Sequence, residues 1–247
     1  NLVDNPNFTD TGSELVTNGD FATDTDWTKN SNWSIGGGTA NADGTSNNAI
    51  SQLNVVEANK SYEVSFTITN ITQGAFYFDL GISSSGVTYS SAGTYTEAIT
   101  AGTINTRVYI GCTGNAIGSI DNVSVKELGA DWTAEGDSSI SIGTHEGRDD
   151  VADININDTS TGSRISQPFT YVANKSYKVT VDVYVVSGSF RIDSSDTYVS
   201  GDFVSTTTTG SWQTLTGYIT ATASGSNYIW LRGISNSIAQ FYVDSVS

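Results

Sequence analysis

The sequence predicts an all-β protein built from two tandem antiparallel β-sandwich domains. Three observations support this fold class: a long internal repeat, a composition rich in β-branched and aromatic residues with no Met, and apolar residues that alternate with polar ones. β-Branched and aromatic side chains favour strands. Alternation at a period of two gives each strand one buried and one exposed face, as in antiparallel sheets that pack in pairs.

The internal repeat sets the domain organisation. The motifs Ile-Ser-Gln and Ala-Asn-Lys-Ser-Tyr begin at Ile50 and Ala58 and return 115 positions later, at Ile165 and Ala173. A period of this length is far too long for a solenoid repeat and suits a whole small domain. We therefore expect two domains, over residues 15–128 and 129–247.

A shorter echo lies at the start of the chain. The segment from Leu2 to Phe8 resembles the segment from Leu15 to Phe21, thirteen residues on. Because an Asp-Trp pair that also opens the second copy follows Phe21 closely, we take Leu15 as the start of the first domain. Residues 1–14 are then interpreted as a linker or as the edge strand of an upstream unit.

Alternation locates the strands of the first domain. Residues 61–69 carry apolar side chains on one face and polar ones on the other, and residues 75–81 repeat the pattern. Three further strands are expected over residues 94–101, 106–111 and 119–125. The expected core positions are Tyr62, Val64, Phe66, Ile68, Phe76, Phe78 and Leu80.

The second domain shows the same pattern. Its clearest strand should bury Tyr177 and the four valines at positions 179, 181, 183 and 185. Short strands at this spacing, separated by turn residues, are typical of a sandwich of two antiparallel sheets. Further strands are expected over residues 189–193, 211–221, 227–233 and 239–246.

The charge balance excludes two classes of partner. The chain has 26 acidic and 10 basic residues, which gives a formal net charge of −16. Nucleic acid or an anionic membrane would require a positive face. No segment approaches the roughly 20 apolar residues that span a bilayer. We therefore expect neither nucleic-acid binding nor membrane insertion.

No motif indicates catalysis. The single histidine, His145, lies in a loop between Gly143 and Gly147 next to several acidic residues, and we expect it to be solvated. The chain has no Gly-x-Ser-x-Gly elbow, phosphate loop or His-rich metal motif. The sequence therefore predicts that the protein is not an enzyme.

Carbohydrate binding is the positive functional hypothesis. Sugars present flat C–H faces that pack on aromatic rings, and their hydroxyls need polar partners. A binding face should therefore show aromatic, amide and charged residues opposite the core. In the second domain the outward positions are Asp182, Tyr184, Arg191, Asp193, Tyr228, Trp230 and Arg232, and in the first they are Tyr77, Asp79, Arg107 and Tyr109. The alternative is that these aromatics cover the outer sheet or pack against the other domain.

The order of the motifs resembles a known family. Leu-Val-x-Asn-Gly-Asp-Phe from Leu15 is followed by Asp26-Trp27, then by Asn-Lys-Ser-Tyr opening a strand at Asn59, then by Ile-Asp-Asn-Val-Ser-Val from Ile120. This order resembles the jelly-roll carbohydrate-binding modules appended to cellulases and xylanases, which have a galactose-binding-domain-like sandwich. It resembles still more the versions found in tail-fibre and other virion proteins of marine bacteriophages. The second copy matches less fully, because it lacks the opening motif and has a weaker closing one.

The resemblance implies a non-catalytic module displayed outside the cell or on a virion surface. It implies a glycan or polysaccharide as partner, with host attachment as the role, and allows a homo-oligomer or contacts with other virion proteins. The alternative reading is a purely structural virion or fibre segment. In the family, tryptophans near the start of such a domain usually belong to the core, which here would apply to Trp27, Trp33 and Trp132.

The resemblance also implies a structural calcium ion where the opening and closing strands meet. The matching oxygen donors in the first domain are Asp20 and Asp121, and Asp244 is the remnant in the second. Calcium takes six to eight oxygen ligands. The alternative is that these aspartates accept backbone hydrogen bonds in turns.

Overall fold

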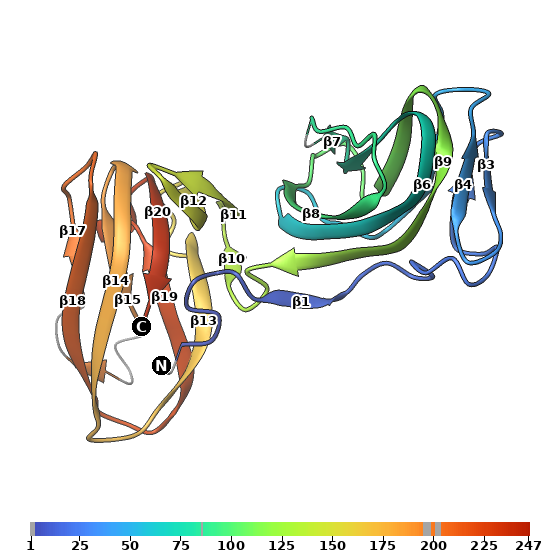
Figure 1. The fold of residues 1–247 in the computed structure, drawn as a ribbon. Helices are drawn as coiled ribbons and strands as arrows, with labels where there is room; N and C mark the ends of the chain where they lie inside the picture. Colours follow the sequence, from blue (N-terminus) through green and yellow to red (C-terminus); the bar gives the residue numbers. More distant parts are fainter. Residues whose placement is uncertain (1–2, 85, 195–198, 201–203) are drawn as a thin grey trace. The chain divides into compact units, whose positions relative to one another are not determined.

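The computed structural model describes residues 3–84, 86–194, 199–200 and 204–247, and within them it is all-β (Figure 1). The chain forms two compact units. The continuous unit is Thr11–Leu128, and the split unit joins Asn1–Asp10 to Gly129–Ser247. The predicted fold class, a pair of antiparallel β-sandwiches, is confirmed. A search of the described residues for helices long and apolar enough to cross a membrane found none.

The continuous unit is organised by two long strands, β6 and β9. The early part of β6 pairs with β8 and with the end of β9, whereas its late part pairs with β7 and with the beginning of β9. Each long strand therefore runs through both layers of the sandwich. The strands are β1 (Thr11–Glu14), β2 (Thr28–Lys29), β3 (Trp33–Ile35), β4 (Ala40–Asp43), β5 (Ala49–Gln52), β6 (Ser61–Leu80), β7 (Ser83–Ser84), β8 (Gly93–Thr100) and β9 (Val108–Leu128).

The bend between the two layers has a local cause. Register shifts between β6 and β9 begin after Ser65 and continue to Ala75, and the last of them spans Gly74, whose φ is +71°. A Cβ at this position would lie 2.3 Å from the carbonyl oxygen of Thr113, so only glycine allows the two backbones to approach this closely. Figure 1 shows β6 and β9 curving together through this region.

The bend folds one strand onto itself across the core. Phe66 and Phe78 both belong to β6, yet their rings stack at a centroid distance of 3.9 Å. All the apolar positions predicted for the first-domain core are buried. The sequence prediction differs in one respect: residues 61–69 and 75–81 form one strand, and so do 106–111 and 119–125, because the bends do not interrupt the hydrogen-bonded ladder.

The split unit consists of two separate antiparallel sheets. The five-stranded sheet has the order β10-β13-β19-β15-β17, and the six-stranded sheet has the order β11-β12-β20-β14-β18-β16. Its elements are β10 (Thr133–Glu135), β11 (Ser138–His145), β12 (Arg148–Ile156), β13 (Arg164–Tyr171), β14 (Ser176–Ser187), β15 (Phe190–Asp193), β16 (Val199–Ser200), β17 (Ser205–Thr206), β18 (Trp212–Ala221), β19 (Gly225–Arg232), the 3₁₀ turn η1 (Ile234–Asn236) and β20 (Ala239–Val246). The predicted strands correspond to β14, β15, β18, β19 and β20, whereas β10 to β13, β16 and β17 were not predicted.

The first residues of the chain complete the split unit. The backbone N–H of Asp4 donates to Gln167 Oε1 at 3.1 Å, and Gln167 Nε2 donates back to the carbonyl of Asp4 at 2.7 Å. Trp132 Nε1 donates to the carbonyl of Asn5 at 3.1 Å, and the ring of Phe8 packs on the Trp132 ring at 5.1 Å. The interpretation of residues 1–14 as a linker is therefore corrected, because residues 3–10 pack into a domain whose other elements begin at residue 129.

The continuous unit has the same arrangement thirteen residues later. Gln52 exchanges two hydrogen bonds of 2.9 Å with the backbone of Thr17, and Trp27 Nε1 donates to the carbonyl of Asn18 at 3.1 Å. Phe21 packs on Trp27 at 5.2 Å. In both opening segments the Asn and the Phe have positive φ, which is unusual outside glycine. The second copy does have an opening motif, supplied by the start of the chain.

The tryptophans at these positions are core residues, as predicted. Trp27, Trp33 and Trp132 are 6%, 5% and 3% exposed.

Equivalent substitutions in the two opening segments should destabilise different units. Phe8→Ala is expected to lower the stability of the split unit by about 3 kcal/mol, because it removes a fully buried ring that packs on Trp132. Phe21→Ala should do the same to the continuous unit. Hydrogen exchange resolved by segment measures this: Phe8→Ala should speed exchange in β13 and β20 and leave β5 and β9 unchanged. Faster exchange only in residues 11–128 after Phe8→Ala would show that the opening segments have been assigned to the wrong units.

Candidate functional site

The outer face of the five-stranded sheet carries the main candidate site. The strand registers place Ser166 on β13, Trp230 on β19 and Asp193 on β15 next to one another in a row across the sheet. Residues two positions away on a strand share its face. Tyr228 and Arg232 therefore flank Trp230 along β19. We call this surface the Trp230 face; it also includes Glu135, Arg164 and Arg191.

Asp193 is the charged centre of the Trp230 face. It is only 1% exposed, and its Oδ2 forms ion pairs with both Arg232 and Arg191, the latter at 3.0 Å. Its Oδ1 accepts the backbone N–H of Ser194 at 2.8 Å. A buried carboxylate is costly unless it is paired and hydrogen-bonded, and both conditions hold here. Arg232 is further oriented by Asn236 Oδ1 at 2.9 Å.

Arginine side chains lie against the ring of Trp230. The guanidinium carbon of Arg164 is 4.3 Å from the ring centroid and that of Arg232 is 5.4 Å away, both within cation–π range. Arg164 is held in place by Glu135 at 2.6 Å. Tyr228, which is 45% exposed, is the more open ring of this face.

Glu135 is ionised, and both of its carboxylate oxygens accept hydrogen bonds from neighbouring side chains. Its partial burial favours the neutral form, but hydrogen bonds from Arg164 and Ser166 outweigh burial and hold the pKa of Glu135 below its ordinary value of 4.5. Its two oxygens bridge Arg164 and the hydroxyl of Ser166. It therefore fixes the position of Arg164 over Trp230.

The continuous unit has an equivalent face, which we call the Tyr109 face. Register places Ser51 on β5, Tyr109 on β9 and Asp79 on β6 in the same kind of row as Ser166, Trp230 and Asp193. The guanidinium of Arg107 lies 4.8 Å from the Tyr109 ring centroid. The four residues predicted for the first domain thus share one face, with Tyr77 as the fourth member.

Tyr77 fills a space that an arginine occupies in the other unit. It is the register neighbour of Gly111, as Arg191 is of Arg232. A Cβ at Gly111 would lie 2.2 Å from Cζ of Tyr77, so the ring lies directly over this glycine. Burial, together with Tyr109 and Asp79 nearby, raises the pKa of Tyr77 to about 12, and its hydroxyl stays protonated at neutral pH. The Tyr109 face is therefore less cationic than the Trp230 face.

The residues predicted for the second domain do not share one face. Arg191, Asp193, Tyr228, Trp230 and Arg232 lie together on the five-stranded sheet, but Asp182 and Tyr184 lie on β14 of the six-stranded sheet. The prediction of a single face is corrected for these two residues. Alternation along a strand separates outward from inward residues, but it does not tell which of two sheets the strand joins.

Asp182 and Tyr184 belong to an aromatic cluster on the outer face of the six-stranded sheet. The ring of His145 stacks on Tyr242 at 3.7 Å and meets the edge of Tyr184 at 4.4 Å. The guanidinium of Arg148 lies 4.1 Å from the centroid of the Trp212 ring. His145 is therefore packed between aromatic rings, and the expectation of a solvated histidine was wrong.

Arg148 links this cluster to two carboxylates. It forms ion pairs with Asp244 at 2.6 Å and with Asp182 at 3.2 Å, and Thr214 donates to Asp182 at 2.5 Å. Asp244, expected as the remnant of a calcium site, is thus engaged by an arginine. The sequence partly indicates this aromatic cluster, since Tyr184, Trp212 and Tyr242 all lie on strands with clear alternation. No sequence pattern near these residues shows that they lie beside the β11–β12 hairpin.

The predicted calcium ligands show no complete site. Asp20 accepts the backbone N–H of Ala22, and Asp121 accepts the backbone and side-chain N–H groups of Asn122. Within the residues described, no group of three or more His, Cys, Asp or Glu side chains could hold a metal ion. The calcium ion stays a prediction, and these two carboxylates fall well short of its usual ligand set.

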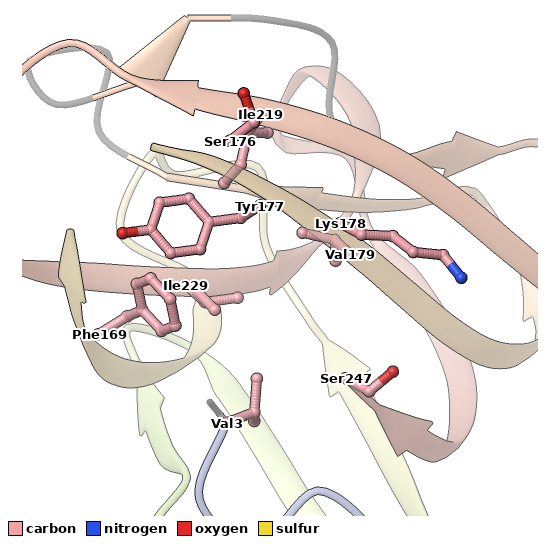
Figure 2. Close-up of a pocket in the computed structure, with 9 residues that line it drawn as sticks. All are labelled: Val3, Phe169, Ser176, Tyr177, Lys178, Val179, Ile219, Ile229 and Ser247. Atoms are coloured by element: carbon pink, nitrogen blue, oxygen red, sulfur yellow. The ribbon is translucent and has the colours of Figure 1, made fainter. Parts of the chain in front are cut away.

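A cavity of about 430 Å³ opens between the two sheets of the split unit. Figure 2 shows its lining, in which the rings of Phe169 and Tyr177 lie on one side and the amine of Lys178 extends away from them. The Tyr177 hydroxyl accepts the backbone N–H of Val172 at 2.9 Å. The lining is mostly apolar, and it lacks the converging polar groups that a hydroxyl-rich ligand needs.

No protein-family model matches the chain, and no curated protein matches it either. Solved structures that match this chain include the N-terminal CBM22-1-CBM22-2 tandem domain of Xyn10C from Paenibacillus barcinonensis. It is 10% identical, with a TM-score of 0.34 and coverage of 96% of this chain and 97% of that one. The tandem CBM51 modules of a family 98 glycoside hydrolase from Streptococcus pneumoniae are 7% identical, with a TM-score of 0.26 and coverage of 84% and 82%. TM-scores this low support no conclusion about function.

Acid should weaken the split unit through Glu135. The pKa of Glu135 is lower in the folded protein than its ordinary 4.5. The ionised Glu135 carboxylate therefore stabilises the folded split unit above about pH 4.5, and this contribution is lost as the pH falls through the pKa of Glu135 in the folded protein. Glu135→Gln should remove this part of the pH dependence, with an effect of about 1 kcal/mol or less because the side chain is 30% exposed.

Urea unfolding of the split unit between pH 3 and 7, followed by segment-resolved hydrogen exchange, measures this effect. Glu146→Gln, in the exposed turn between β11 and β12, is the control and should leave the profile unchanged. Identical acid profiles for the wild type and Glu135→Gln would show that the ion pair with Arg164 contributes nothing.

Proposed function

We propose that the chain is a non-catalytic carbohydrate-binding protein with two equivalent recognition faces, the Trp230 face and the Tyr109 face. The observation that carries this proposal is the repeated row of a serine, an aromatic ring and an aspartate on equivalent strands of the two units. The core alone does not require such a row on the outward side of a sheet. A shared outward pattern in two otherwise diverged copies favours a shared ligand class.

The chemistry of both faces suits a sugar. Tyr228 and Tyr109 offer ring surface for the C–H faces of a pyranose, and tyrosine hydroxyls and guanidinium N–H groups offer partners for sugar hydroxyls. Arg107 and Arg232 are held against aromatic rings, so little conformational entropy is lost when a ligand binds them. Two modest sites on one chain raise the apparent affinity for a polysaccharide that engages both.

The carboxylates of these faces support binding rather than hydrolysis. A glycosidase needs one carboxyl group with a raised pKa as the acid and a second one across the sugar. The pKa of Glu135 is lowered by its partners, and Asp193 is enclosed by two arginines. Glu135 therefore stays ionised at neutral pH, and both carboxylates are already paired with arginines.

The setting of the protein is proposed from the sequence motifs. The resemblance to modules of secreted cellulases and xylanases, and to bacteriophage virion proteins, supports display outside the cell or on a virion, where the module attaches its carrier to glycans. A second candidate is a structural segment that contacts other copies or other virion proteins. The exposed ring of Tyr218, 66% accessible on β18, favours this alternative because it lies outside both proposed faces.

Removal of the two central rings should separate the hypotheses. Trp230→Ala should lower the affinity for a bound glycan at least tenfold, because it removes both ring surface and the support of Arg164 and Arg232. Tyr109→Ala should lower it less, and the double variant should abolish binding. A glycan array followed by titration calorimetry measures the loss.

The matched control is Trp212→Ala, which removes a tryptophan from the opposite sheet of the same unit. It should leave glycan affinity unchanged. Absence of binding to any polysaccharide, with a stable oligomer in solution that buries Tyr228, would reject the proposal in favour of the structural alternative.

A further inference from the structure

The arginines of the chain are concentrated on the two proposed faces. Of five arginines in a protein with a net charge of −16, four lie there: Arg107 on the Tyr109 face, and Arg164, Arg191 and Arg232 on the Trp230 face. Arginine differs from lysine in its planar fork, which matches carboxylate and sulfate oxygens. The placement therefore sets these faces apart from the acidic remainder of the molecule.

Among the described residues, the Trp230 face has three arginines and two carboxylates. Glu135 balances Arg164, but the single carboxylate of Asp193 is shared by Arg191 and Arg232. Arg232 is the more enclosed partner, with 17% of its side chain exposed, whereas Arg191 is 36% exposed. The surplus positive charge is therefore most accessible at Arg191.

The unsatisfied polar atoms of this face are all donors. Arg164 Nε, Trp230 Nε1 and Arg232 Nε are buried N–H groups without a hydrogen-bond partner among the described residues. Unpaired buried donors cost free energy and are best satisfied by a strong acceptor. The same face leaves no buried acceptor unpaired within the described part of the split unit. These three atoms are themselves buried, so an anionic ligand meets the exposed guanidinium of Arg191 instead.

From these features we infer that the Trp230 face binds an acidic saccharide, one that carries a uronic acid carboxylate or a sulfate ester. The anionic group lies at Arg191, and the sugar ring lies beside Tyr228 and Trp230. The inference rests on the proposed function and narrows its ligand class. The Tyr109 face, which has one arginine and has Tyr77 at the position of Arg191, should contribute no preference for charged over neutral saccharides.

Arg191 can be tested without loss of the fold. Its removal leaves Asp193 paired with Arg232 and with the backbone of Ser194. Arg191→Gln removes the charge and keeps a polar N–H donor on a shorter side chain, and Arg191→Lys keeps the positive charge but lacks the planar guanidinium. Arg148→Gln is the matched control, because Arg148 is an arginine of similar exposure on the opposite sheet, where two aspartates already hold it.

The probes differ in charge alone. Calorimetry at 0.15 M salt, where the rest of the protein is screened beyond about 8 Å, compares oligogalacturonate with its carboxyl-reduced form, and a carrageenan oligosaccharide with its desulfated, neutral form. We expect the charged member of one pair to bind about tenfold more tightly. Arg191→Gln should abolish that preference, Arg191→Lys should restore part of it, and Arg148→Gln should leave it intact.

Three outcomes are informative against the inference. Equal binding of charged and neutral members would overturn it and leave the proposed function standing. Binding of inorganic sulfate alone, at the affinity of the sulfated glycan, would reduce the site to a simple anion site. No binding of any of the four saccharides, or of any glycan on the array, would remove the proposed function and this inference together.

Discussion

Both the core and the candidate faces depend on one interaction, the pair of hydrogen bonds by which a buried glutamine amide holds the opening segment of each unit. Gln52 and Gln167 are 8% and 2% exposed, and each amide pairs with both backbone groups of one residue of its opening segment. A buried amide must be satisfied in this way, which fixes the glutamine inward. Because side chains alternate along a strand, the residue before it must point outward.

That outward residue is the serine at the end of each candidate row. Ser51 and Ser166 precede the two glutamines, and each lies next to the aromatic residue of the adjacent strand. A one-residue slip of β5 or β13 would place the serine in the core and the glutamine beside the ring. The closure of the sandwich and the layout of its outer face are therefore set by the same register.

Much of the fold could be predicted from the sequence, because alternation and the repeat are local or nearly local signals. The buried residues of β6 and β14 show this, since period-two patterns alone place them. The sorting of Asp182 and Tyr184 to a different sheet from Trp230 could not be predicted, because it depends on strand order. The prediction that His145 is solvated was wrong for a similar reason, because Tyr242, on which its ring stacks, lies almost 100 residues further along the chain. The opening segment of the split unit is separated from Trp132 by an entire unit, so proximity in sequence was misleading.

The interruption of the split unit bears on how the chain reaches its folded state. Bringing the ends of a flexible segment as long as Thr11–Leu128 together would cost about 4 kcal/mol in loop closure. The continuous unit removes most of this cost, because Thr11 and Leu128 are paired neighbours on β1 and β9. It is also synthesised in full before β13 and β20 exist, and units that emerge first tend to fold first. Once the continuous unit has folded, residues 3–10 and the chain after residue 128 start from neighbouring positions on β1 and β9. Their association then has the entropy cost of closing a short loop rather than a long one.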